Sequence, residues 1–151
     1  LYYYTSYFST RPDDFEIETM IKGYDAIKAR IIELTNKGYD VTNKETAVLE
    51  CLKMALEATA RGFSFAPIDL NESGAIYFKV KDEHSIYPPF RSIEGLGDTV
   101  AQNIVDEREK QPFLSIEDVQ KRAKVSSTLI DKMRTMGIFD GMDESSQLSL
   151  F

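Results

Sequence analysis

The first third of the chain carries apolar side chains at the spacing of helix faces. Between Asp13 and Lys37 they recur every three or four residues, which predicts a helix with one buried side. Gly23 is the position at which this helix could break, and Gly38 is suited to its carboxyl-terminal end. The apolar face consists of Met20, Ile21, Tyr24, Ile27, Ile31 and Leu34.

A second helix is predicted after Thr42-Asn43-Lys44-Glu45. This tetrapeptide has the spacing of a capping box, in which the threonine hydroxyl accepts from the glutamate amide and the glutamate carboxylate accepts from the threonine amide. The helix should run to about Arg61 and close at Gly62. Its apolar stripe consists of Val48, Leu49, Leu52, Ala55, Leu56 and Thr59.

The period changes to strict alternation from Ala75 to Lys81, which predicts a half-buried strand. Asp82-Glu83-His84 can turn the chain, so that Ser85-Ile86-Tyr87 pairs back as a short hairpin. Pro88-Pro89 ends this region, because proline cannot donate to a sheet ladder, and is the best internal boundary. One strand face holds Ile76, Phe78 and Val80, and the other holds Tyr77, Lys79 and Lys81.

Helical spacing returns after the prolines. Asp98 to about Lys110 predicts an amphipathic helix, and a short helix begins at Ser115-Ile116-Glu117-Asp118. A third helix runs from Ser127 to Met136 behind a Ser126 cap. From Asp140 the sequence is mostly Gly, Asp, Glu and Ser, which is typical of a flexible tail.

The pattern therefore predicts a mostly α protein in three parts. Residues 1–87 form a helical region with a short strand pair, residues 88–140 form a second helical domain, and residues 141–151 form a flexible tail. Of the 151 residues, 42% are hydrophobic, which is enough for one ordinary core or two small ones. No apolar run approaches the roughly 18 residues of a membrane helix, so no membrane association is expected.

Few residues offer catalytic or metal-binding chemistry. Cys51 and His84 are the only cysteine and histidine, which excludes a zinc site of the usual composition. A structural role is favoured for Cys51 because no histidine is placed to activate it, and His84 is better explained as a solvated turn residue. The lone cysteine fits a reducing, cytoplasmic compartment. The start, Leu1 to Thr5, lacks the basic residues of a signal peptide, and the missing initiator Met indicates a fragment or a processed chain.

The net charge of −7 argues against a simple nucleic-acid binder, but the charge is unevenly spread. Between Val119 and Met136 there are five basic residues against the single acid Asp131, and it is the local charge that faces a ligand. A solvated helix face explains the same cluster. The basic residues are Lys121, Arg122, Lys124, Lys132 and Arg134.

Gly95-Leu96-Gly97 predicts the turn of a phosphate-binding helix-hairpin-helix, between an apolar segment ending at Ile93 and the next helix. Glycine permits a positive φ and leaves no side chain to keep a ligand away. The amides of the turn and of Asp98, Thr99 and Val100 would point outward together. They lie at the positive end of the helix dipole, where backbone amides bind phosphate without reading bases. An ordinary tight connection between helices is the alternative.

Three basic residues are candidates to support this site: Arg91, Arg108 and Lys124. Lys124 belongs to a second hairpin, Ala123-Lys124-Val125, which lacks glycines and is predicted to be more structural than phosphate-binding. Pro88-Pro89 leaves the first helix of the first hairpin very short.

The chain ends in Gln147-Leu148-Ser149-Leu150-Phe151. Large apolar side chains at the end of a polar tail are unfavourable in water. The end could pack back on the core of its own chain. Alternatively, it is a short linear motif in which Leu150 and Phe151 fill a pocket on a partner and Gln147 fixes the register.

The chain resembles the carboxyl-terminal end of the PolC-type alpha subunits of bacterial DNA polymerase III. The resemblance covers essentially all of the chain, and its last stretch resembles the pentapeptide by which bacterial polymerases hold the sliding clamp. The matching stretches are Tyr7-Phe8-Ser9, Thr19-Met20-Ile21-Lys22-Gly23, Arg61-Gly62-Phe63-Ser64-Phe65, Ile68-Asp69-Leu70, Pro88-Pro89-Phe90, Ile93-Glu94-Gly95-Leu96-Gly97, Phe113-Leu114-Ser115-Ile116-Glu117-Asp118 and Gln147-Leu148-Ser149-Leu150-Phe151.

This resemblance implies a segment of a replicative DNA-directed DNA polymerase of the C family. Residues 1–87 would belong to the distal fingers, residues 88–140 would bind duplex DNA through a tandem helix-hairpin-helix, and Gln147–Phe151 would tether the enzyme to the clamp. The implied partners are double-stranded DNA, the sliding clamp and the remainder of the polymerase. The aspartates that hold two magnesium ions would lie upstream. Asp13-Asp14 and Asp82-Glu83 do not match them, so no catalytic residue, metal ligand or cofactor is expected in this segment.

Three other functions compete with this interpretation. A pure protein-interaction module would use the glycine turn only for structure. A helix-hairpin-helix accessory domain of a DNA-repair protein or nuclease would leave residues 1–87 and the terminal motif unexplained. A free-standing enzyme would need a catalytic constellation that the sequence does not offer.

Overall fold

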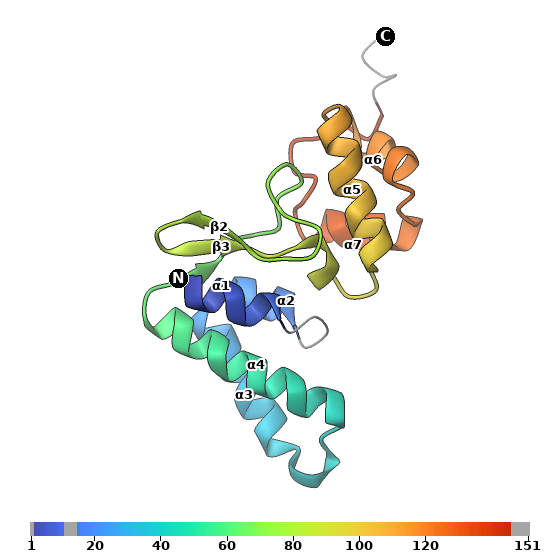
Figure 1. The fold of residues 1–151 in the computed structure, drawn as a ribbon. Helices are drawn as coiled ribbons and strands as arrows, with labels where there is room; N and C mark the ends of the chain where they lie inside the picture. The colour runs from blue at the N-terminus through green and yellow to red at the C-terminus, as the bar shows by residue number, and fades with distance from the viewer. Residues whose placement is uncertain (1, 11–14, 146–151) are drawn as a thin grey trace.

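The computed structural model describes residues 2–10 and 15–145 of the chain. Within these residues the fold is mostly helical, which confirms the predicted class, and one cluster of buried residues runs through both halves. Figure 1 shows α3 and α4 side by side at one end, the sheet in the middle and α5, α6 and α7 at the other end. The α-helices are α1 (Tyr2–Ser9), α2 (Ile17–Lys22), α3 (Tyr24–Asn36), α4 (Asn43–Ala60), α5 (Asp98–Lys110), α6 (Ile116–Ala123) and α7 (Ser127–Thr135). The 3-10 helices are η1 (Gly38–Asp40) and η2 (Phe90–Ser92), and the strands are β1 (Ser64–Phe65), β2 (Lys79–Asp82) and β3 (Ser85–Tyr87).

Gly23 divides the first predicted helix into α2 and α3. Its φ of 98° lies in the left-handed region, which glycine adopts without steric cost. Its N–H donates to the carbonyl of Met20 at 3.2 Å, which ends α2. The predicted start of this helix, at Asp13, lies outside the described residues.

The capping box predicted for α4 is present. The amide of Glu45 donates to Thr42 Oγ1 at 3.0 Å, and the amide of Thr42 donates to Glu45 Oε1 at 3.2 Å. Cys51 is fully buried on this helix, in agreement with a structural role. The helix ends at Ala60, one residue before the predicted end.

The predicted strand pair is shorter than expected and has a third member. β2 begins at Lys79 instead of Ala75, because the carbonyls of Gly74 and Ala75 accept from amides of η2, at 2.9 and 3.1 Å. β3 pairs antiparallel with β2 and parallel with β1, so the strand order is β1-β3-β2. β1 has two residues, which is too short for an alternating pattern to predict.

Aromatic side chains join α1 to the sheet. The ring centroid of Phe8, which is fully buried, lies 5.1 Å from that of Phe65 and 5.6 Å from that of Phe78. Tilted and edge-on aromatic pairs of this kind add about 0.5–1.5 kcal/mol each beyond the area they bury. The Ser9 hydroxyl also accepts from the amide of Phe78 at 3.0 Å. α1 is therefore part of the core beneath β2.

The segment after α7 is hydrogen-bonded to the domain as far as Glu144. The first two amides of α6, those of Ile116 and Glu117, donate to the carbonyls of Asp143 and Glu144 at 2.9 and 3.0 Å. Helix amides at these positions have no partner inside the helix, so a passing chain segment can satisfy them. The remainder of the predicted tail, residues 146–151, lies outside the described residues.

Candidate nucleic-acid interface

The Gly95–Gly97 turn joins η2 to α5 and is held from below by Leu96. The Leu96 side chain is buried, and its amide donates to the carbonyl of Ile93 at 3.0 Å. Both glycines are exposed. The turn therefore presents backbone to solvent and places its one side chain in the core.

The two glycines serve different purposes. Gly95 has a φ of 87°, a conformation that other residues adopt only with strain. Gly97 has an ordinary extended conformation, with φ −77° and ψ 168°, and a Cβ added there would meet no described atom within 4 Å. Neither backbone geometry nor packing requires glycine at position 97. The effect of glycine there is that no side chain fills the space at the start of α5.

The start of α5 also lacks a side-chain cap. Serine hydroxyls cap α6 and α7 by accepting from the amides of Asp118 and Leu129, at 3.1 and 3.3 Å. Gly97 is the N-cap of α5 and can do nothing similar. The amides of Asp98, Thr99 and Val100 precede the first intrahelical bond, which Ala101 donates to the Gly97 carbonyl at 3.0 Å. The helix itself therefore leaves the amide donors of these three residues unused.

The second turn, Lys124–Ser126 between α6 and α7, repeats this backbone. Lys124 has left-handed dihedrals, φ 58° and ψ 45°, where the first turn has Gly95. Val125 is buried as Leu96 is, and Ser126 is the extended N-cap in the place of Gly97. The two hairpins are thus a pseudo-tandem pair, although glycine is absent from the second. The second hairpin was predicted at this place, but the left-handed conformation of Lys124 was not, because a lysine rarely adopts positive φ.

Two of the three basic residues predicted to support the site are used inside the protein. The Arg108 side chain is 12% exposed, and its Nη1 donates to the carbonyls of Leu70 and Ser73 at 3.1 and 2.6 Å. Arg108 also lies ten residues along α5 from Asp98, about 15 Å from the turn at 1.5 Å per residue. Arg91 is also mostly buried, with its Nε 3.6 Å from Asp98 Oδ1. Arg108 therefore holds the loop before β2 and lies away from the turn that it was predicted to support, whereas Lys124 is exposed.

Most of the basic cluster on α6 and α7 is paired with acids. Arg122 binds Asp118 and the carbonyls of Pro112 and Gln111, and Arg134 binds Asp131 and Glu144.

Lys121 pairs with Glu117 on the same helix. The hydrogen bond between them lowers the pKa of the Glu117 carboxyl and raises the pKa of the Lys121 ammonium. The solvated-face explanation therefore fits Arg122, Arg134 and Lys121.

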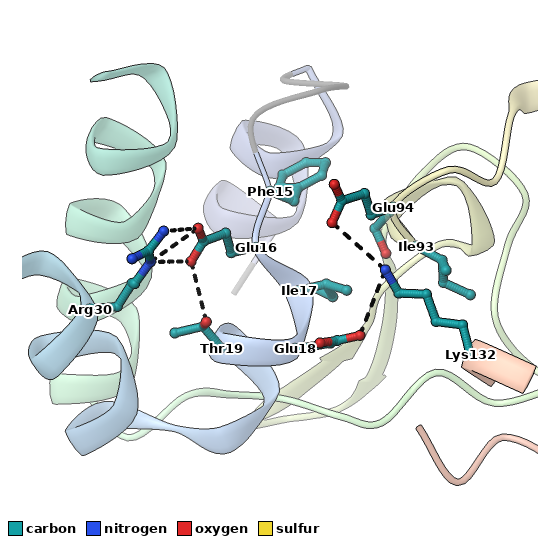
Figure 2. Close-up of a pocket in the computed structure, with 10 residues that line it drawn as sticks. Phe15, Glu16, Ile17, Glu18, Thr19, Arg30, Ile93, Glu94 and Lys132 are labelled. Carbon is teal, nitrogen blue, oxygen red and sulfur yellow. Dashed lines mark hydrogen bonds and ion pairs between the residues drawn. The ribbon is translucent and has the colours of Figure 1, made fainter. Parts of the chain in front are cut away.

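A groove of about 790 Å³ runs beside the first turn, between α4 and the hairpin. A second hollow of about 320 Å³ adjoins it and is lined by Glu16, Arg30 and Lys132, among others. Figure 2 shows that Arg30 and Lys132 lie on opposite sides of this hollow, each facing carboxylates. The exposed face of the turn is therefore open on the side of the amino-terminal helices.

The described residues include no group of three or more His, Cys, Asp or Glu side chains placed to hold a metal ion. No helix in the same part of the chain is long and apolar enough to cross a membrane. His84 is exposed beside the β2–β3 turn, and its amide donates to Asp82 Oδ1 at 2.8 Å, which lowers the pKa of that carboxyl. The predicted clamp-binding residues, Gln147, Leu148, Ser149, Leu150 and Phe151, lie outside the described residues.

Comparisons with known proteins agree with this geometry. A family model described as "Helix-hairpin-helix motif" matches residues 62–148. DNA polymerase III PolC-type of Lacticaseibacillus paracasei and that of Bacillus subtilis are each 47% identical to this chain over 151 residues, which is 100% of the chain and 10% of each relative. The corresponding protein of Listeria monocytogenes is 44% identical over the same length and share. The chain thus spans about a tenth of the length of these curated relatives, and the resemblance predicted from its motifs is confirmed.

Proposed function

Because the chain belongs to the helix-hairpin-helix family, we propose that it binds the backbone of duplex DNA without reading its sequence, as a segment of a replicative DNA polymerase. The observation that carries the proposal is the uncapped start of α5 behind Gly97. A structural turn would gain stability from a serine or aspartate cap at this position. The absence of such a cap favours a ligand that supplies the missing acceptor, and a phosphate oxygen is suited to that place.

The first turn would hold one phosphate with backbone donors. The amides of Asp98, Thr99 and Val100 would donate to phosphate oxygens at the positive end of the α5 dipole. Because these donors are identical at every residue, they contact phosphate and leave base identity unread. Such contacts allow the protein to move along DNA between equivalent phosphates.

The second turn would contact a further phosphate of the same duplex. It has the backbone of the first, and the exposed Lys124 adds a positive charge where the first turn has none. Ser126 already caps the amide of Leu129. We therefore expect the second turn to act mainly through the Lys124 ammonium and the first mainly through amides.

The tail would bind the sliding clamp through Gln147–Phe151. Support comes from the sequence pattern and from the few residues that separate this motif from Glu144. Because Glu144 is hydrogen-bonded to α6, the segment after Ser145 has six residues and can reach at most about 20 Å. A tether this short would hold the clamp close to the helix-hairpin-helix domain and keep the local DNA concentration high.

Nucleotide transfer would be performed elsewhere in the polymerase. We expect the magnesium ions of the enzyme to be held by carboxylates upstream of this segment, and the remainder of the polymerase to be its covalent partner. Cytoplasmic replication of the bacterial chromosome would place the protein in the cytoplasm.

DNA binding is tested by fluorescence anisotropy of the 151-residue chain with two labelled primer-templates of unrelated sequence. Both should bind equally, and log K should fall with log salt by about 0.9 for each phosphate contacted. Absence of binding at low salt would favour the pure interaction module. A strong preference for one sequence would contradict backbone binding.

Clamp binding is tested separately with purified bacterial sliding clamp. Replacing both Leu150 and Phe151 by alanine should weaken clamp binding more than a hundredfold. Burial of each side chain in the clamp would contribute about 1.5–3 kcal/mol to the binding free energy. Ser149→Ala is the matched control and should bind as the parent does. A chain that binds DNA but not clamp would favour the DNA-repair accessory domain.

A further inference from the structure

Lys132 links three separate parts of the fold next to the first turn. It lies on α7, and its Nζ is 3.7 Å from Glu94 Oε2 and 3.9 Å from Glu18 Oε1. Glu94 immediately precedes Gly95, and Glu18 lies on α2 in the amino-terminal region. Figure 2 shows the ammonium between the two carboxylates, which approach it from different elements.

These two ion pairs contribute little to stability. Both separations are near the outer limit for an ion pair, and the carboxylate side chains are 83% exposed at Glu94 and 56% at Glu18. Exposed pairs of this kind are worth about 0–1 kcal/mol. The two arginines of the cluster are held more closely, as in the 3.0 Å contact of Arg122 with Asp118 and the 2.7 Å contact of Arg134 with Asp131. Lys132 is therefore held weakly enough to change partners.

The position of Lys132 favours a phosphate as the new partner. Leu129, one helical turn earlier on α7, lies against the first turn: a Cβ added at Gly95 would stand 3.8 Å from Leu129 Cδ2. Lys132 reaches the residue just before that glycine. A phosphate on the amides at the start of α5 would bring a full negative charge to the neighbourhood of the Lys132 ammonium. It would also bring that charge near Glu94, which repels it unless Lys132 lies between them.

We propose that the Lys132 ammonium binds a DNA phosphate, and that Glu18 and Glu94 pair with it when DNA is absent. The proposal rests on the DNA-binding function above. When DNA binds, the ammonium turns from the carboxylates to a phosphate beside the first turn. α2 then loses its ionic contact with α7, so DNA binding loosens one link between the amino-terminal helices and the hairpin domain. By thermodynamic reciprocity, weakening that link strengthens DNA binding.

The experiment is a set of double-mutant cycles on the 151-residue chain, read by anisotropy with a primer-template across a salt series. Lys132→Met keeps the partly buried stem and should weaken binding about tenfold, with a salt slope smaller by about one. Glu18→Gln and Glu94→Gln should each tighten binding about two- to fivefold. In the Lys132→Met background the Glu18→Gln gain should disappear. Glu33→Gln is the control, because it removes the same charge from an exposed pair with Arg30 and should leave affinity unchanged.

The outcomes separate the two proposals. If the parent chain binds no duplex, the proposed function is wrong and this inference with it. If the parent binds and Gly97→Ser weakens it, while Lys132→Met matches the parent in affinity and salt slope, only this inference is wrong. The pairing with carboxylates is also refuted if Glu18→Gln tightens binding equally with and without Lys132. That result would mean that the carboxylate repels DNA directly.

Discussion

Gly97→Ser separates the stability of the first turn from its ability to bind DNA. The serine hydroxyl would cap an amide at the start of α5, as Ser126 caps the amide of Leu129 in the second turn. Position 97 has an extended backbone and no described atom within 4 Å of an added Cβ, so the side chain fits without strain. Replacing glycine by serine at an N-cap stabilises by a few tenths of a kcal/mol, which raises the melting temperature by about 1 °C.

DNA binding should change in the opposite direction. The hydroxyl takes one donor from the phosphate, and a hydrogen bond to a charged group is worth about 1.5–3 kcal/mol. A loss of about 2 kcal/mol corresponds to roughly thirtyfold weaker binding, at about 1.4 kcal/mol for each factor of ten. The salt slope should also decrease, by about 0.9 if the phosphate contact is lost altogether.

The assay is fluorescence anisotropy with a labelled primer-template over a salt series, together with a thermal melt of each variant. Ser126→Gly is the matched control, because it removes a cap from the second turn and leaves the first unchanged. It should lower stability by a few tenths of a kcal/mol and leave affinity within about twofold. A Gly97→Ser variant that binds DNA as tightly as the parent, with the same salt slope, would refute the assignment of the α5 amides to phosphate.

Three further predictions follow from the contacts of single residues. Arg108→Met should lower the free energy of unfolding in urea by about 2–3 kcal/mol, because two loop carbonyls lose their donor. The folded variant should bind DNA as the parent does, and loss of binding would show that Arg108 contacts DNA. Lys124→Gly should raise stability by about 1 kcal/mol, because it removes the backbone strain of a lysine in the left-handed conformation. The same change should weaken DNA binding and reduce the salt slope by about one, and an unchanged slope would show that the ammonium contacts no phosphate. The pKa of Glu117 is lowered by Lys121, so this pair stabilises the protein above pH 4.5 and the benefit is lost as pH falls through the lowered pKa. Glu117→Gln should therefore melt below the parent at pH 7 and converge with it in acid, and a constant difference at all pH values would contradict this.

Local sequence determined the helices, their caps and the first turn. The Thr42–Glu45 capping box, the Ser115 and Ser126 caps and the glycine at position 95 each depend on interactions within about four residues. Such interactions are present in any conformation of the surrounding chain, which is why spacing and residue type were sufficient to predict them. The resemblance to polymerase sequences was also carried by short motifs.

Tertiary structure alone decided which side chains are available to a ligand. Arg108 had the charge expected of a phosphate contact, but the carbonyls of Leu70 and Ser73, more than thirty residues away, take its hydrogen bonds. Lys124 adopts a left-handed conformation because the packing of α6 against α7 requires a turn there, against the preference of lysine.

Long-range contacts likewise decided the strand pairing and the surroundings of Lys132. β1 pairs with a strand some twenty residues later, and the chain after α7 satisfies the amides of Ile116 and Glu117. Lys132 meets Glu18 only because the fold brings these residues of α7 and α2 together. Contacts between residues far apart in sequence depend on how the whole core closes, so local patterns predicted the helices and the first turn, whereas the packed fold determined which charged groups are exposed.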